Sequence, residues 1–304
     1  MKRQAFYIPV LMLAVAILLA PRPAPAQNAC VILSSTAQPF KEAKEGFRKG
    51  FGGTVEEIVM PPEPARASEI VASITAKSCK VVIPMGSAAL KFLRLRVSDM
   101  PIVFAMTLSP AAIKSEGLNM TGVYLEPSPG MQLASIRKVL PAARRVGVLY
   151  SSPSEYLSML ERNAGGAGLE IVAVRAPKIG DAVREAESLV KRSDLLLMIP
   201  DVVTSTHEVF KSILLSSLSG NIPIFALAEK HVEAGALAAL ATDYESNGAQ
   251  AAVMARRVAA GASASSIKPD YSNKAGLVLN LKVAAKLGIV VPEAAINEAI
   301  EIYR

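Results

Sequence analysis

The residues whose chemistry could define an enzyme are few in this sequence. The chain has only two histidines and two cysteines, too few for the usual zinc cluster. His207 and His231 each stand alone, and a lone histidine is usually structural. The spaced motifs of serine hydrolases, zinc proteases, phosphate loops and dinucleotide sites do not occur. The sequence therefore predicts no catalytic residue, no metal site, no cofactor and no enzyme activity.

Small hydroxylated residues do recur, at the ends of short apolar runs that read as strands. In sequence order these ends contain Ser34, Ser35, Thr36, Met60, Gly86, Ser87, Met106, Thr107, Ser151, Ser152, Ala176, Asp201 and Glu229. Parallel sheets bind ligands at the carboxyl ends of their strands, where helix N-termini attract anions. A lone acid such as Asp201 would suit an amine. The alternative is that the serines and threonines only cap helices.

The elements that carry these ends occur twice. Cys30-Val-Ile-Leu-Ser-Ser is matched by Val146-Gly-Val-Leu-Tyr-Ser-Ser, and Pro101-Ile-Val-Phe-Ala by Pro223-Ile-Phe-Ala. Each copy alternates apolar strands with amphipathic helices, a pattern that favours a doubly wound parallel sheet. We expect an α/β protein with two Rossmann-like lobes, 27–125 and 126–240, and a ligand cleft between them. A tail, 241–304, would cross back and pack on both lobes.

The expected elements can be given as approximate ranges. Strands are predicted near 31–35, 54–59, 80–84, 101–105 and 120–124, then near 145–150, 169–174, 194–200, 222–227 and 236–241. Helices are predicted near 38–50, 66–78 and 87–98, then near 154–166, 180–192 and 205–219. The tail should add a helix near 245–260, a strand near 276–281 and two short helices. Chain crossings between the lobes are expected near 122–128, 230–236 and 242–276.

The first residues read as an export signal. Lys2 and Arg3 precede an apolar run over 7–20, and small residues at 24 and 26 fit a signal-peptide cleavage site. We expect a signal peptide over 1–26 and a periplasmic protein. A lipoprotein acylated on Cys30 is the alternative, although the residues before Cys30 lack the usual aliphatic residue. With 304 residues, 51% hydrophobic residues and no Lys/Arg run behind the net charge of +7, a nucleic-acid partner is not expected.

Export changes the meaning of the two cysteines. Cys30 begins one apolar strand, and Cys79 directly precedes another. In neighbouring parallel strands, about 4.8 Å apart, two such residues lie within reach of a disulfide. We predict a Cys30–Cys79 disulfide, with two buried free thiols as the alternative.

Several later motifs resemble a known family. Ile222-Pro-Ile-Phe-Ala, Val232-Glu-Ala-Gly-Ala-Leu, Asp243-Tyr244, Gly248-Ala-Gln-Ala-Ala and Leu279-Asn-Leu occur in order. They resemble the ABC-transporter substrate-binding proteins of type I periplasmic-binding fold, in the branch that includes tryptophan- and tyrosine-type binding proteins. The resemblance extends over 28–300.

The resemblance implies a solute held between the lobes by loops after the first, third and fourth strands of each. Carried over, the ligand-binding residues are Ser34, Ser35, Gly86, Ser87, Thr107, Ser151, Ser152 and Asp201. Amino-acid-binding members carry an Asn after the first strand of lobe two and Asp-Asn after its third. Here these places read Ser151-Ser152-Pro153 and Asp201-Val202-Val203, so an α-amino acid is a doubtful ligand.

The expected function is capture of a small polar or amino-acid-like solute, delivered to a membrane ABC permease by a monomeric binding protein. A ligand sensor of the same fold, docking on a membrane receptor, is the alternative. A secreted enzyme is disfavoured because the sequence shows no nucleophile–base pair.

Overall fold

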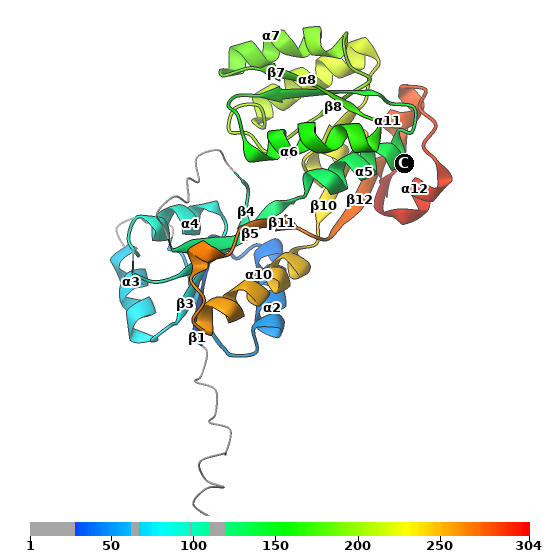
Figure 1. Cartoon of the computed structure of the whole chain (residues 1–304). Coiled ribbons are helices and arrows are strands. Elements are labelled where there is room, and N and C mark those ends of the chain that lie inside the picture. The colour runs from blue at the N-terminus through cyan, green and yellow to red at the C-terminus, as the bar shows by residue number, and fades with distance from the viewer. Residues whose placement is uncertain (1–27, 62–66, 98, 110–118) are drawn as a thin grey trace, which may run out of the picture.

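Two β-sheets organise the chain in the computed structural model, which describes residues 28–61, 67–97, 99–109 and 119–304 (Figure 1). Sheet one has the strand order β11-β5-β4-β3-β1-β2, and sheet two the order β13-β12-β10-β9-β8-β6-β7. We call sheet one with the helices packed on it lobe one, and sheet two with its helices lobe two. The signal peptide predicted over 1–26 lies outside the described residues.

The strands of sheet one are β1 (Asn28–Leu33), β2 (Thr54–Val59), β3 (Val81–Met85), β4 (Ile102–Thr107), β5 (Met120–Pro127) and β11 (Asp270–Ser272). Those of sheet two are β6 (Arg145–Tyr150), β7 (Glu170–Arg175), β8 (Leu195–Leu197), β9 (Ile224–Ala226), β10 (Ala238–Thr242), β12 (Ala275–Asn280) and β13 (Ala299–Tyr303). Every pair in sheet one is parallel.

The helices in lobe one are α2 (Gln38–Phe51), α3 (Ala67–Ala76), α4 (Ser87–Arg94) and α10 (Tyr244–Ala259), with the short η3 (Ala264–Ser266). Lobe two has α5 (Pro129–Val139), α6 (Glu155–Ala164), η2 (Gly165–Ala167), α7 (Ile179–Val190), α8 (His207–Gly220), α9 (Glu229–Glu233), α11 (Leu281–Lys286) and α12 (Glu293–Glu298). None of the helices in this described part of the chain is long and apolar enough to cross a membrane.

Two doubly wound lobes were predicted, and two largely parallel sheets confirm them. Sheet two departs from the all-parallel prediction because β12 runs antiparallel to β10. β10 leads out of lobe two into lobe one, whereas β12 returns from lobe one, so the two strands must run in opposite directions. β13 follows β12 in parallel and extends the reversed edge.

Alternate residues of β1 supply the two cores of lobe one. Val31 and Leu33 pack toward α2 and α10, and Cys30 and Ile32 pack toward α3 and α4. This alternation is the period of a strand covered on both faces. On the α3/α4 face, Cys30 forms a disulfide with Cys79, as predicted, because β1 and β3 are neighbouring parallel strands.

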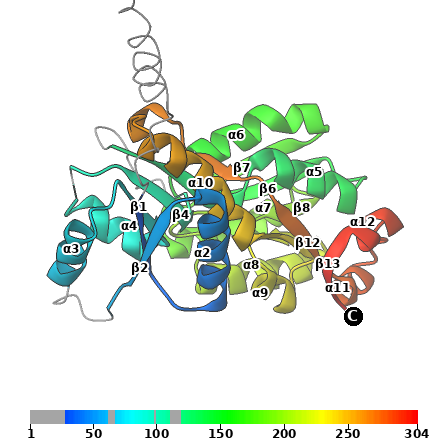
Figure 2. The same cartoon turned by 90° about the horizontal axis from the view of Figure 1, so that it is seen from below.

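Helix α10 joins lobe one although it follows lobe two in the sequence. It lies along α2 in both views (Figures 1 and 2), and glycines let the two backbones approach closely. A Cβ on Gly248 would lie 1.8 Å from the carbonyl oxygen of Ala43, and one on Gly46 would lie 1.9 Å from that of Glu245. Only glycine fits at these two positions without separating the helices.

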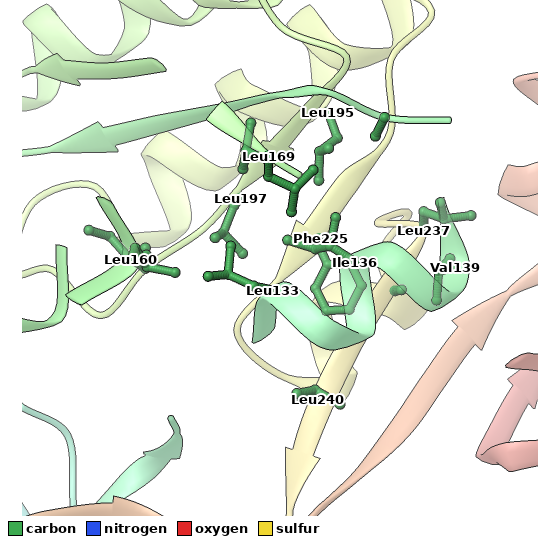
Figure 3. Packing of buried hydrophobic residues seen from close by; sticks show 14 of the residues in the cluster. Leu133, Ile136, Val139, Leu160, Leu169, Leu195, Leu197, Phe225, Leu237 and Leu240 are labelled. Carbon is green, nitrogen blue, oxygen red and sulfur yellow. The ribbon is translucent and has the colours of Figure 1, made fainter. Parts of the chain in front are cut away.

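The core of lobe two is built from leucine, isoleucine and valine of α5 and α6 against the sheet (Figure 3). Leu195 and Leu197 of β8 and Phe225 of β9 point into this cluster, together with Leu133 and Ile136 of α5. Helices α7, α8 and α9 cover the other face through a separate apolar cluster. Each lobe is therefore a three-layer α/β unit with its own core.

Three chain segments connect the lobes. They lie between β5 and α5, between β10 and α10, and between β11 and β12 (Figure 1). The crossing expected near 230–236 was wrong, because α9 occupies Glu229–Glu233 and packs within lobe two. The connections are tied together: the Thr242 hydroxyl donates to the Leu125 carbonyl oxygen at 2.6 Å, and the Asp243 N–H to that of Lys274 at 3.1 Å.

Candidate functional site

The loops after β1 and β3 come together at the carboxyl edge of sheet one. The Ser34 N–H donates to the carbonyl oxygen of Met85 at 3.0 Å, and the Ser34 hydroxyl oxygen accepts the N–H of Ala89 at 2.9 Å, in the first turn of α4. The Ser35 hydroxyl oxygen accepts the N–H of Ala37 at 3.1 Å. Both serines therefore hold loop and helix backbone, which is the capping role weighed in the sequence.

Gly86 lets these two loops meet. Its φ is +98°, and a Cβ there would lie 2.7 Å from the Ser34 hydroxyl oxygen and 2.8 Å from the Phe40 ring. Any other residue would push the loops apart. Ser87, the first residue of α4, is exposed at the same edge. The structure thus groups Ser34, Gly86 and Ser87.

Thr107, at the end of β4, is fully buried. Its hydroxyl donates to the Ala105 carbonyl oxygen at 3.2 Å, so in this structure it faces its own strand. The preceding residue, Met106, has a left-handed φ of 57°, a conformation that costs free energy outside glycine.

Asn247 of α10 holds the strand end at Met106. This fully buried residue accepts the N–H of Met106 at 3.1 Å and donates to the Tyr124 carbonyl oxygen at 2.8 Å. It therefore holds the ends of β4 and β5 against the first turn of α10, directly after the connection from lobe two. The sequence prediction did not include Asn247, although an asparagine among the small residues of a buried helix face indicates a side chain that binds backbone groups.

Asp201, after β8, binds the loop after β6. One carboxylate oxygen accepts the N–H and the hydroxyl of Ser151, both at 2.8 Å; the other accepts the N–H groups of Val203 at 2.9 Å and Thr204 at 2.8 Å. Burial acts to raise the pKa of Asp201, but the hydrogen bonds outweigh it and lower the pKa below its usual value. Ser152 lies beside Ser151 and is half-buried.

Glu126, near the end of β5, is the acidic residue that sequence reasoning missed. Its side chain is 3% exposed, and its two carboxylate oxygens accept the N–H of Ser109 at 2.8 and 3.1 Å. Burial raises the pKa of Glu126 to about 7, against the opposing effect of the Ser109 hydrogen bonds. The apolar residues at the start of β5 do not indicate that a buried acid stands near the end of the strand.

A row of aromatic rings crosses from lobe one to lobe two beside Glu126. Ring centroids are 5.1 Å apart for Phe104 and Tyr124, 5.2 Å for Tyr124 and Tyr271, and 5.4 Å for Tyr271 and Tyr156. These rings come from β4, β5, β11 and α6, and the Tyr156 hydroxyl donates to the Pro127 carbonyl oxygen at 3.2 Å. Burial and the charge of Glu126 raise the pKa of Tyr124 to about 12.

A cavity of about 620 Å³ opens between the lobes next to this row. Tyr124 and Tyr271 line it, with Met254 from α10 and Met159 from α6. An ion pair joins the lobes at its edge, because Lys268 lies 3.0 Å from Glu155 of α6. The cavity is therefore bounded by residues from both lobes.

Nothing in the described ranges assembles a metal site, since no three histidine, cysteine, aspartate or glutamate side chains cluster there. His231 packs on Phe210 with ring centroids 4.6 Å apart, and burial, with His207 nearby, lowers its pKa. An imidazole packed on a phenyl ring in this way has a structural role.

Comparison with known proteins gives a consistent match. The family model described as "ABC transporter substrate binding protein" matches residues 61–303. A tyrosine-binding protein of Clostridioides difficile (strain R20291) is 24% identical over 233 residues, which are 73% of this chain and 65% of that protein. The match thus spans just under two thirds of the relative's length.

Two solved structures share the fold. An ABC domain in complex with L-Trp from Streptococcus pneumonia is 20% identical with a TM-score of 0.60, covering 91% of this chain and 99% of that one. A ligand-free, open structure of a substrate-binding protein with adhesive properties from Clostridium difficile is 17% identical with a TM-score of 0.66, covering 92% and 99%. These likenesses confirm the predicted two-lobe architecture.

Proposed function

The chain belongs to the ABC transporter substrate-binding protein family, and from this premise we propose that it captures a small amino-acid-like solute between its lobes for a membrane ABC importer. The observation that carries the proposal is the family match across 61–303 in a chain folded as two α/β lobes joined by three connections. Membership of a binding-protein family also confirms that the chain is not an enzyme.

The candidate solute contacts lie on both lobes. From lobe one we propose Ser34, Ser35, Gly86, Ser87 and Thr107, and from lobe two Ser151, Ser152 and Asp201. Of these, Ser87 is exposed, whereas Thr107 is fully buried and would have to turn its hydroxyl outward on binding. Backbone donors at the start of α4 would suit a carboxylate.

The solute class rests on the relatives. One is named for tyrosine and another holds L-Trp, which makes an aromatic amino acid the first compound to test. The missing amides after β6 and β8 favour a wider search among related amines and acids. We propose that the protein works in the periplasm, reached through the signal peptide predicted over 1–26.

Native mass spectrometry of protein purified without refolding tests this function. We expect one small molecule per chain, released on unfolding and identified by its mass. Titration should then show that the same compound binds the emptied protein at one site. A chain that carries no compound, and binds none of the twenty amino acids, their amines or their deaminated acids, would contradict the proposal.

A further inference from the structure

Glu126 is a buried acid, and none of the described residues places a cation beside it. It is 3% exposed, and within the part of the chain that the structure describes no Lys, Arg or His nitrogen lies within ion-pair distance. Among the described residues the Ser109 N–H donates to both oxygens, and the Ser109 hydroxyl and the Glu126 N–H lie close enough to lower the pKa of Glu126. A buried carboxylate without a cation is costly, so a partner supplied from outside the chain would relieve it.

Two further buried acceptors, one beside Glu126 and one beside Tyr156, lack partners among the described residues. The Ser109 hydroxyl oxygen lies beside Glu126 and Tyr271, yet none of the described residues meets it in hydrogen-bonding geometry. The same holds for the amide oxygen of Gln132, a residue of α5 that is 2% exposed and lies beside the Tyr156 hydroxyl. Buried polar atoms in native proteins are nearly always paired.

The surroundings favour a cation. The rings of Tyr124, Tyr271 and Tyr156 form a continuous row here, and aromatic faces attract cations. Tyr124 and Tyr271 also line the interlobe cavity, and the charge of Glu126 acts on both tyrosines.

We propose that Glu126 binds an ammonium group of the solute, with the Ser109 hydroxyl and the Gln132 amide oxygen as its other acceptors. An ammonium group has three donors. The Ser109 hydroxyl and the Gln132 amide oxygen have no partner among the described residues, and the Glu126 carboxylate has further lone pairs beyond those that accept the Ser109 N–H. The inference rests on the proposed function and deepens it, because it makes the solute an amine and adds a residue to the site.

Asp201 is less suited to this role. Four donor groups of its own lobe already occupy its two oxygens, whereas the Glu126 carboxylate accepts the Ser109 N–H and has the Ser109 hydroxyl close by. A metal ion is also less suited, since no three histidine, cysteine, aspartate or glutamate side chains cluster among the described residues.

Calorimetric titration with matched compounds tests the proposal. The probes are L-tyrosine, tyramine and 3-(4-hydroxyphenyl)propionate, with L-tryptophan, tryptamine and indole-3-propionate as the second set. In wild type, compounds with an amine should bind more tightly than their deaminated partners. Glu126→Gln keeps an oxygen that can accept the Ser109 N–H. It should lower the affinity for the compounds with an amine about ten- to a hundredfold and leave the affinity for the deaminated acids unchanged.

Two more variants keep the test decisive. Ser109→Ala removes only the hydroxyl group and should lower the affinity for the same amines several-fold. This variant provides the test if Glu126→Gln does not fold. Glu298→Gln removes an exposed carboxylate of α12 that pairs with Lys138 of α5, and it should leave all six affinities unchanged.

The titrations distinguish the role of Glu126 from the proposed capture of a solute. Equal affinities of wild type and Glu126→Gln for the amines would overturn the role of Glu126 and leave solute capture intact. Preferred binding of the deaminated acids would do the same. Binding of none of the six probes or the remaining amino acids would contradict the proposed function, and the inference with it.

Discussion

Glu126 should make the stability of this protein depend on pH in an unusual direction. Its pKa is raised from 4.5 to about 7 by burial, so the folded chain holds a proton that the unfolded chain releases. The stabilisation is complete below pH 4.5 and is lost as pH rises through 7, about 3 kcal/mol in all. The facing tyrosines stay neutral in this range because their pKa values are also raised.

Urea unfolding at pH 4.5, 6 and 8 measures this dependence. The difference between wild type and Glu126→Gln isolates it, because His231 titrates alike in both proteins and its lowered pKa acts in the opposite direction. A difference in unfolding free energy that stays constant with pH would show that Glu126 is not protonated in the folded chain.

Asp201, one of the proposed solute contacts, should affect binding chiefly by positioning the loop that carries Ser151. Asp201→Ala leaves the N–H groups of Ser151, Val203 and Thr204 without their acceptor. We expect a loss of unfolding free energy of at least about 2 kcal/mol, with affinity lowered equally for amine and deaminated probes. Melting curves and calorimetric titration measure both. A ten- to hundredfold loss confined to amines would instead place the solute's cation on Asp201, as the sequence predicted.

Most individual elements could be predicted from the sequence, because each strand is a short apolar run. The run over 54–59 matches β2, and 145–150 matches β6. The prediction omitted α5, whose Pro129 start lay at the expected lobe boundary, and β11 and β13, which are too short or too exposed to give a pattern. Glu126 escaped notice because its donor, Ser109, comes from another strand end.

The contact between α2 and α10 should fail if either glycine gains a side chain. Gly248→Ala places a Cβ 1.8 Å from the Ala43 carbonyl oxygen, so the helices must separate. We expect a loss of about 1–3 kcal/mol in unfolding free energy. Gly166→Ala is the matched control, because no atom lies within 4 Å of its new Cβ. Equal stability of the two variants in chemical denaturation would show that the helices do not pack this closely.

The disulfide should stabilise lobe one. Cys30 and Cys79 are 49 residues apart, and closing a loop of this length contributes about 4 kcal/mol on the chain-entropy model. The Cys30→Ala/Cys79→Ala double variant should lose most of this in denaturant unfolding. Thiol titration of the unfolded wild-type chain without reductant should detect no free thiol from these residues. Two thiols per chain would refute the disulfide.

At the scale of the molecule, the three connections between the lobes decide how a solute is held. They lie close together and are bound to one another through Thr242 and Asp243, so a change of lobe angle would concentrate in a few residues. The ion pair between Lys268 and Glu155 is exposed and contributes little to that angle. The solute itself, held by residues of both lobes, would supply the free energy of closure.

Small-angle X-ray scattering with and without a bound solute tests this account most directly. The compound should be the one recovered from the native protein, at a concentration that calorimetry shows to be saturating. We predict a smaller radius of gyration for the complex, because the lobes close on the solute. An unchanged radius of gyration with a saturating, tightly bound compound would contradict capture between the two lobes.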